Sequence, residues 1–84
     1  MYEIIFSKKS AKFINRLGAG YKNKIKKIFE VMKNNPFSYP YKKIKGETDL
    51  YRIRVGNYRI LYQVDKNKKW IIILKIDKRE KIYG

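Results

Sequence analysis

The segment 50–64 constrains the fold of this chain more than any other part of the sequence. Apolar residues occupy every second position on both sides of Gly56-Asn57. A two-residue period is typical of a strand that buries one face, and a two-residue turn with glycine commonly joins two such strands. We therefore predict an antiparallel hairpin in which Arg54 lies opposite Arg59.

A third strand is predicted over residues 70–76, after a short polar turn. Pairing Val64 with Trp70 would place Arg59 opposite Lys75 and would sort apolar and cationic side chains onto different faces. Because successive side chains of a strand point to opposite faces, a one-residue slip would mix the two sets. The predicted core face consists of Tyr51, Ile53, Val55, Tyr58, Ile60, Tyr62, Val64, Trp70, Ile72, Leu74 and Ile76.

The residues before the hairpin predict a short strand followed by two helices. The strand is expected at 2–6, and apolar residues at helical spacing predict helices at about 8–17 and 20–34. Residues 36–48 show no period, and the two prolines there argue against a regular element. The order β-α-α-β-β-β predicts one α+β domain over 1–84, with a helical hairpin packed on one face of an antiparallel sheet.

The net charge of +15 indicates a polyanionic partner. Nucleic acid is the first candidate, an acidic protein the second and an anionic membrane the third. The alternative explanation is compositional: a proteome rich in Lys, Ile and Asn, of which a heat-adapted one is an example. Heat-adapted surfaces usually carry Glu along with Lys, whereas this chain has only seven acidic residues against twenty-two basic ones.

The absence of Cys and His restricts the available chemistry. Without them the chain has no disulfide, no thiolate nucleophile, no imidazole base and none of the commonest metal ligands. We therefore expect neither a metal nor a cofactor. No apolar run approaches the ~20 residues of a membrane span, and no signal peptide is recognised, so we expect a cytoplasmic protein without a membrane partner.

Arginine is scarce in this chain and is concentrated in its second half. Four of the five arginines follow residue 50, whereas seventeen lysines are spread throughout. Arg can bind a phosphate with two parallel hydrogen bonds, while like charges placed directly opposite one another destabilise a sheet. We interpret the predicted open face of the sheet as a phosphodiester-binding site; a merely solvated basic face is the alternative. Its predicted members are Arg52, Arg54, Arg59 and Lys75, joined by Arg79 from the tail.

Apolar residues are predicted on the same open face, beside the cations. An exposed apolar patch often marks a protein interface, and the alternative here is a second small core beneath a loop. In the predicted register these residues are Leu50, Leu61, Ile71 and Ile73.

Several stretches together resemble the RelE/ParE toxin superfamily. They are the opening strand with Phe6-Ser7-Lys8-Lys9, the helix pair, the loop Lys43-Ile44-Lys45-Gly46, the block YRIRVGNYRILYQV and the ending Lys78–Tyr83. The resemblance covers nearly the whole chain, and the hairpin block is specific to the superfamily but does not separate its branches. RelE-type members are ribosome-dependent endoribonucleases that cut mRNA in the A site, whereas ParE-type members share the fold and poison DNA gyrase.

The resemblance implies roles for several residues. On the RelE pattern, Arg59 would stabilise the scissile phosphate, Arg79 would support the leaving group, and Tyr83 would orient the substrate or stack on it. Arg52 and Arg54 occupy positions where RelE-type members often carry lysines. Because Arg stays protonated, these two residues cannot readily serve as the base that activates a 2′-hydroxyl.

The resemblance therefore implies the toxin of a type II toxin–antitoxin system that cuts mRNA to a 2′,3′-cyclic phosphate without a metal. A ParE-like gyrase inhibitor and a non-enzymatic RNA-binding module are the alternatives. The expected partners are the ribosome, mRNA and a small acidic antitoxin. Catalytic roles are expected for Arg54, Arg59, Arg79 and Tyr83, RNA contacts for Arg52, Lys42, Lys43, Lys45 and Lys75, and antitoxin contacts for Leu61, Ile71 and Ile73.

Overall fold

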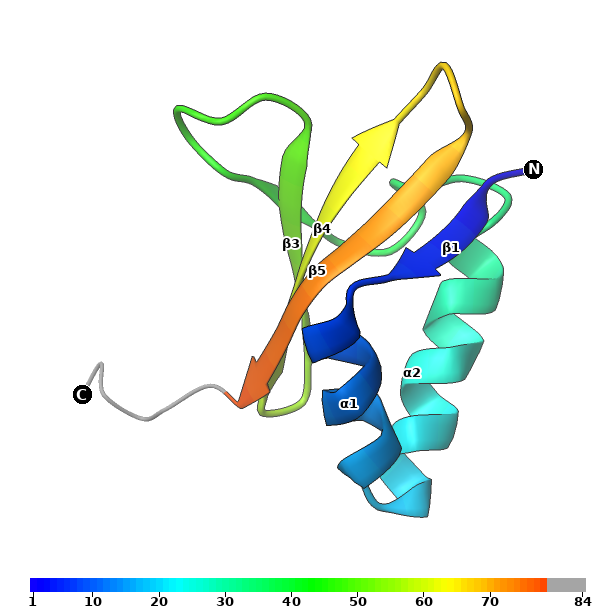
Figure 1. The fold of residues 1–84 in the computed structure, drawn as a ribbon, viewed down its shortest axis with the longest axis vertical. Coiled ribbons are helices and arrows are strands. Elements are labelled where there is room, and N and C mark those ends of the chain that lie inside the picture. The colour runs from blue at the N-terminus through cyan, green and yellow to red at the C-terminus, as the bar shows by residue number, and fades with distance from the viewer. Residues whose placement is uncertain (79–84) are drawn as a thin grey trace.

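The computed structural model describes residues 1–78, which form two helices and a five-stranded sheet (Figure 1). The predicted helices are confirmed, with ends within two residues of those expected, and so is the predicted hairpin. Within this part of the chain, neither helix has the length and apolarity that crossing a bilayer requires. In chain order the elements are β1 (Glu3–Phe6), α1 (Lys8–Arg16), α2 (Ala19–Met32), β2 (Lys42–Lys43), β3 (Leu50–Val55), β4 (Tyr58–Asp65) and β5 (Trp70–Lys78).

The sheet is mixed rather than wholly antiparallel. Its strand order is β1-β5-β4-β3-β2, and β1 runs parallel to β5 while the other neighbouring strands are antiparallel. A period-two pattern indicates which side chains share a face, but it carries no information about the direction of the next strand. The predicted α+β architecture is thus confirmed, but the prediction of a wholly antiparallel sheet is wrong for β1.

A short strand lies within the segment 36–48, where the sequence pattern predicts no regular element. β2 consists of Lys42 and Lys43, which pair with Arg52 and Tyr51 at the outer edge of β3. Proline is tolerated beside an edge strand but cannot donate a backbone hydrogen bond. The prolines of this segment therefore shorten the strand without excluding it.

The predicted register between β4 and β5 is wrong by one residue between the turn and a β-bulge, and by two residues beyond the bulge. β4 continues to Asp65, which pairs with Trp70, so that Val64 lies opposite Ile71 rather than Trp70. A β-bulge between Leu61 and Tyr62 then shifts the register again, and a bulge of this kind inserts one unpaired residue into the ladder.

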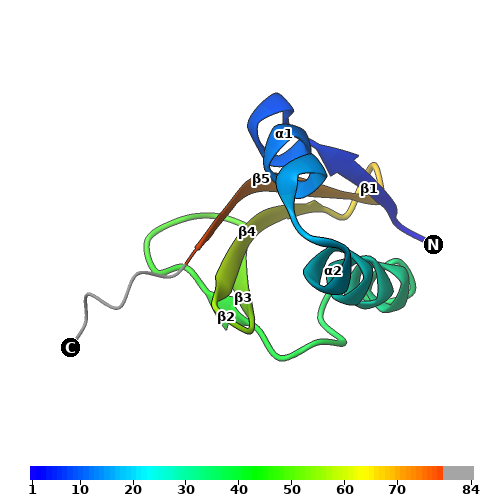
Figure 2. The same cartoon turned by 90° about the horizontal axis from the view of Figure 1, so that it is seen from below.

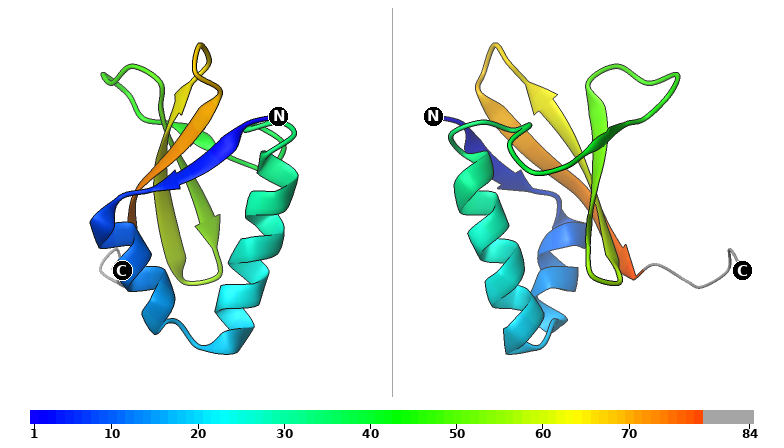
Figure 3. Two further views of the ribbon diagram at one scale, coloured as in Figure 1. Left: turned by 45° about the vertical axis from the view of Figure 1, so that its right-hand side comes forward. Right: turned by 180° about the vertical axis from the view of Figure 1, so that it is seen from behind.

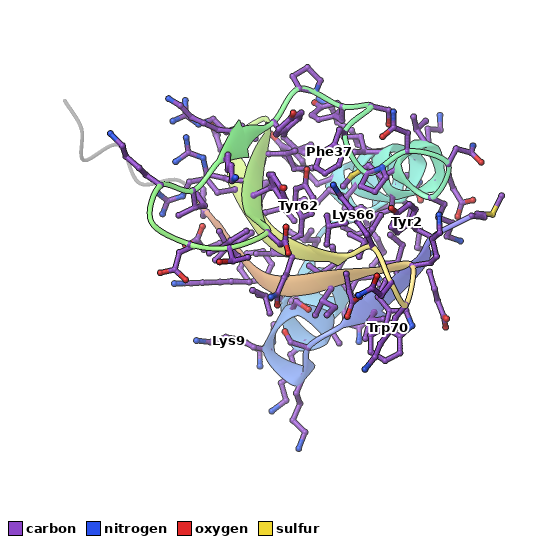
Figure 4. The ribbon with its side chains drawn as sticks, turned by 90° about the horizontal axis from the view of Figure 1, so that it is seen from above. Tyr2, Lys9, Phe37, Tyr62, Lys66 and Trp70 are labelled. Atoms are coloured by element: carbon purple, nitrogen blue, oxygen red, sulfur yellow. The ribbon has the colours of Figure 1, made fainter. Side chains whose placement is uncertain are left out.

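The shifted register exchanges the two faces of β5 between the turn and the bulge. Ile71 and Ile73 are 0% exposed and belong to the core, so they cannot form the predicted antitoxin surface. Trp70, Ile72 and Leu74, predicted for the core face, are only half-buried. Figure 4 shows the Trp70 ring on the opposite side of β5 from Tyr62.

The core lies between α2 and the concave face of the sheet. Figure 2 shows α2 within the curve formed by β5, β4 and β3, and Figure 3 shows α1 and α2 joined as a hairpin at one end of the molecule. Because each apolar stripe would otherwise face water, the helix and the sheet stabilise one another by burying these side chains. The buried members are Ile25, Ile28, Phe29, Met32, Tyr51, Ile53, Val55, Ile60, Tyr62, Val64, Ile71, Ile73 and Ile76.

The first helix begins where β1 leaves the edge of β5. Ser7 is the N-cap of this helix, and its side-chain oxygen accepts a hydrogen bond from the backbone N–H of Ser10. Ser10 is fully buried, and its hydroxyl donates to the carbonyl oxygen of Ile73 at 2.9 Å. These contacts satisfy polar groups at an edge of β5 that β1 no longer covers.

The hairpin turn between β3 and β4 requires glycine at its first position. Gly56 has φ +60°, and a Cβ built there would lie 2.5 Å from the hydroxyl oxygen of Tyr21. Gly56→Ala is therefore expected to lower the free energy of unfolding by about 2–4 kcal/mol, since left-handed backbone strain and overpacking add. Thermal unfolding followed by circular dichroism should show a midpoint lower by roughly 10–30 °C.

Gly20 in α2 provides the matched control for this substitution. Its added Cβ would meet nothing within 4 Å. Alanine is favoured over glycine in a helix, so Gly20→Ala should leave stability unchanged or raise it by up to about 1 kcal/mol. Equal destabilisation by the two substitutions would contradict the assignment of the turn and of the Tyr21 contact.

Candidate nucleic-acid interface

The open face of the sheet carries two cross-strand rows of side chains. Residues directly opposite one another on neighbouring strands point to the same face. The first row runs Arg54, Arg59, Asp77 across β3, β4 and β5, and it confirms the predicted pairing of the two arginines. The second row runs Lys42, Arg52, Leu61, Lys75 across β2, β3, β4 and β5. We call these seven residues the cationic face.

Asp77 is a member of this face that the sequence analysis missed. Its two carboxylate oxygens accept hydrogen bonds from Nε and Nη2 of Arg59, each at 3.2 Å, and Lys75 Nζ lies 3.6 Å from Oδ2. Two parallel bonds to one carboxylate fix the plane of a guanidinium group. The pair also reduces the repulsion between Arg54 and Arg59. The predicted register concealed Asp77 because it placed Lys75 opposite Arg59.

A pocket of about 210 Å³ lies in the middle of the cationic face. Leu61 contributes an apolar wall, and three of the lining side chains are cations against one carboxylate. Such a pocket suits an anionic group that brings its own oxygen acceptors, because the guanidinium and ammonium groups supply only donors. The lining residues are Ile44, Arg52, Arg59, Leu61, Lys75 and Asp77.

A second pocket, of about 300 Å³, lies at the outer edge of β3. Its walls combine two aromatic rings, of Tyr39 and Tyr41, with three cationic side chains. Arg52 lines both pockets, so the two are adjacent. The two tyrosines were not predicted as site residues, although aromatic and cationic residues both occur within residues 39–43. The lining residues are Tyr39, Pro40, Tyr41, Lys42, Arg52 and Arg54.

The predicted site residues divide into three groups. Lys42, Arg52, Arg54, Arg59, Leu61 and Lys75 come together on the cationic face. Lys43 pairs with Tyr51 and so points to the other face, while Lys45 is exposed in the loop that follows β2. Arg79 and Tyr83 lie outside the residues that the structure describes, and their predicted roles stay predictions.

The fold suppresses the ionisation of Tyr62. Burial raises the pKa of Tyr62 far above its usual value, and the neighbouring Tyr41 and Tyr51 raise it further. The hydroxyl donates a hydrogen bond to the carbonyl oxygen of Pro36 at 3.2 Å. Tyr62 is therefore a structural residue that joins β4 to the segment after α2.

Within residues 1–78, no three carboxylates gather into a group that could hold a metal ion.

Comparison with known proteins places this geometry among toxins of toxin–antitoxin systems. The family described as "ParE toxin of type II toxin-antitoxin system, parDE" matches residues 4–83. Toxin RelE3 of Methanocaldococcus jannaschii is 36% identical over 85 residues, covering 96% of this chain and 94% of that protein.

Solved structures agree with the sequence relatives. The isolated RelE toxin of E. coli superposes with a TM-score of 0.86 at 25% identity, covering 99% of this chain and 92% of that one. The toxin in the RelB–RelE antitoxin–toxin complex of Methanococcus jannaschii gives 0.75 at 34% identity, with 94% of each chain covered. The structural match extends over nearly the whole of both chains.

Proposed function

The chain belongs to the RelE/ParE toxin superfamily of type II toxin–antitoxin systems, and we propose that it is a ribosome-dependent endoribonuclease that cuts mRNA in the A site. The observation that carries the proposal is the convergence of Arg52, Arg54 and Arg59 on one open face. A passive basic surface would not need three guanidinium groups on adjacent strands, where like charges destabilise the sheet. Binding of a phosphodiester to this face accounts for the arrangement.

In the proposed reaction, the 2′-oxygen of the RNA attacks the adjacent 3′-phosphorus. The new P–O2′ bond forms as the P–O5′ bond breaks, which yields a 2′,3′-cyclic phosphate and a free 5′-hydroxyl. The 2′-hydroxyl loses a proton during attack, and the leaving 5′-oxygen gains one. Negative charge builds up on the non-bridging oxygens, and donors placed in advance at those oxygens lower the barrier.

The residues of the cationic face divide this work. Arg59 and Arg54 would bind the non-bridging oxygens, and Arg52 and Lys75 would hold the neighbouring backbone. Asp77 would be a positioning residue that keeps the Arg59 guanidinium in one plane through its paired hydrogen bonds. From the tail, Arg79 would support the leaving oxygen and Tyr83 would fix the base.

Dependence on the ribosome is expected of a site that supplies positive charge to the phosphate but no strong base for the 2′-hydroxyl. A substrate already held in the geometry of attack spares the protein most of the entropic cost of orienting it. Lys42, Lys43 and Lys45 would contact the rRNA backbone, which gives affinity that is insensitive to sequence and sensitive to salt. The site of action would be the cytoplasm, where the ribosomes are.

The antitoxin is proposed to act by covering the same cations. RelB is bound to RelE in the M. jannaschii complex, and an acidic segment of the partner of this chain would compete with RNA for the cationic face. Leu61 would give that segment an apolar contact among the charges. Ile71 and Ile73 play no part in this surface, because they are fully buried.

Primer extension on translated mRNA tests the proposal directly. The purified protein should produce cuts within A-site codons when ribosomes are present, with a 2′,3′-cyclic phosphate at the new end. Gyrase inhibition is the second candidate, since the matching family is described as ParE toxins. If the added protein stops DNA gyrase from supercoiling DNA and produces no mRNA cuts, gyrase inhibition replaces the proposal. RNA binding with neither effect would leave a non-enzymatic binding module.

A further inference from the structure

We propose that the pocket at the outer edge of β3 binds one unpaired base of the RNA, stacked on Tyr41, next to the phosphate held by the cationic face. The proposal rests on the proposed function and adds a second substrate contact to it. The contact comes from the segment 39–42, which precedes and enters β2 and is separate from the residues proposed for chemistry.

The pocket exists because the β2–β3 ladder is short. Lys42 pairs with Arg52, and continuing this register along the edge would bring Tyr41 opposite Ile53 and then Pro40 opposite Arg54. Proline has no backbone N–H to donate, so the ladder ends there. The outer edge of β3 then borders an open volume of about 300 Å³ instead of another strand. This volume is at the small end of the roughly 300–1,000 Å³ range of ligand pockets, which suits a single nucleotide.

Tyr41 offers an aromatic surface that the fold has already oriented. Its ring centroid lies 5.1 Å from that of Phe37 and 5.6 Å from that of Tyr51, the latter in a T-shaped contact. Figure 4 shows Phe37 on the same side of the sheet as Tyr62. Even so, 47% of Tyr41 is exposed. An exposed ring held by two others can stack on a base with little further loss of side-chain entropy.

Tyr39 closes the other end of the aromatic wall. It is half-buried, and its hydroxyl lies 3.4 Å from the carbonyl oxygen of Arg54, to which it donates a weak hydrogen bond. This contact ties the segment before β2 to the open end of β3. The two tyrosines and Pro40 therefore form a wall whose position is set by the sheet and not by the loop alone.

The charges of the pocket identify its occupant as a nucleotide. Lys42, Arg52 and Arg54 line it together with the tyrosines, and among the described residues that line it none is acidic. Aromatic rings beside a cationic groove are the combination with which proteins hold single-stranded RNA: the rings stack on bases and the cations bind phosphates. An apolar ligand would bring no acceptor for these donors.

Arg52 connects this pocket to the proposed reaction. It lines both the Tyr41 pocket and the pocket that contains Arg59 and Asp77. A phosphate in the Arg59 pocket and a base in the Tyr41 pocket would therefore belong to neighbouring nucleotides of one strand. Stacking one of these bases would pull the RNA out of a helical stack and extend it across β3.

Binding of short single-stranded RNA by the isolated protein, measured by fluorescence anisotropy, tests the inference without requiring cleavage. Tyr41→Leu retains apolar contact with Phe37 and Tyr51 but removes the stacking ring. It should weaken RNA binding by about 5- to 150-fold, the range expected for loss of one stacked base. Tyr41→Phe should bind like the wild type. Phe6→Leu is the matched control, since Phe6 is 40% exposed on β1 at the opposite edge of the sheet.

An RNA with one abasic nucleotide makes the test specific. Wild type should lose affinity for it by the same factor, and Tyr41→Leu should lose nothing further, because both changes remove the same contact. Independent losses, or normal RNA affinity of Tyr41→Leu, would overturn the inference, and so would absence of RNA binding by the wild type. Normal RNA affinity with weakened antitoxin binding would assign the pocket to the protein partner. If A-site cleavage fails while Tyr41-dependent RNA binding holds, only the proposed function is lost.

Discussion

Replacing Arg59 with alanine is expected to reduce the rate of mRNA cleavage by about 10²–10³-fold, the loss seen when one donor to a developing oxyanion is removed. Two hydrogen bonds of 3.2 Å to Asp77 hold the Arg59 guanidinium group in place. A guanidinium fixed in this way needs no reorientation when charge appears on the phosphate. Single-turnover cleavage of ribosome-bound mRNA, read by primer extension, measures the effect.

Arg16→Ala is the matched control for this prediction. Arg16 lies in the last turn of α1 and is exposed, so its replacement removes the same charge far from the cationic face. Both variants lower the net charge equally, and a general loss of electrostatic attraction would affect them alike. Cleavage by Arg59→Ala at the rate of Arg16→Ala would remove Arg59 from the mechanism.

Asp77→Asn tests whether the fixed orientation of Arg59 contributes to the rate of cleavage separately from its positive charge. An amide cannot offer two anionic oxygens to the guanidinium, so Arg59 loses its fixed plane while the face gains positive charge. If Asp77 is a positioning residue, kcat should fall by up to about 10²-fold, because small misplacements at a reacting centre are costly. The Michaelis constant should stay the same or decrease. A rise in kcat would instead indicate that Asp77 only weakens the site by neutralising it.

The hairpin could be predicted from the sequence because its determinants are local. Gly56 permits the left-handed turn, and the alternation on either side admits only one register that buries Ile53 and Ile60 together. The helices were predictable for the same reason, since Ser7 and the apolar spacing after it lie within one short segment. The resemblance of the hairpin block identified the family that the comparisons show.

The register of β5 could not be predicted because it depends on a β-bulge and on a turn that is one residue shorter than the sequence pattern indicates. Bulges arise from the twist and packing of the finished sheet, and the residues Leu61 and Tyr62 carry no local signal for one. The extra pair at the turn, Asp65 with Trp70, and the bulge each shift the register by one residue, and together they determine that Asp77, and not Lys75, faces Arg59. The Tyr41 pocket could not be predicted either, because it forms between the irregular segment before β2 and the edge of β3, which follows later in the chain.

Ile73→Asp is expected to unfold the protein, which tests this register directly. Ile73 is 0% exposed and pairs with Tyr62 in the core, so a carboxylate there would have to be buried without a partner or neutralised. The cost should be about 4 kcal/mol or more, a large part of the ~5–15 kcal/mol that stabilises small domains. Urea unfolding followed by circular dichroism measures it.

Leu61→Asp provides the decisive comparison, because the predicted register would place Leu61 and Ile73 together on the open face. In the structure Leu61 lies directly opposite Arg52 on one side and Lys75 on the other. A carboxylate there would meet opposite charges across both strands, so stability should change by no more than about 1 kcal/mol. RNA affinity should nevertheless fall, since the new charge enters the phosphate pocket. If the two variants are equally stable, the register predicted from the sequence, with Val64 opposite Trp70, is the correct one. Ile73 would then be a surface residue that the antitoxin could contact.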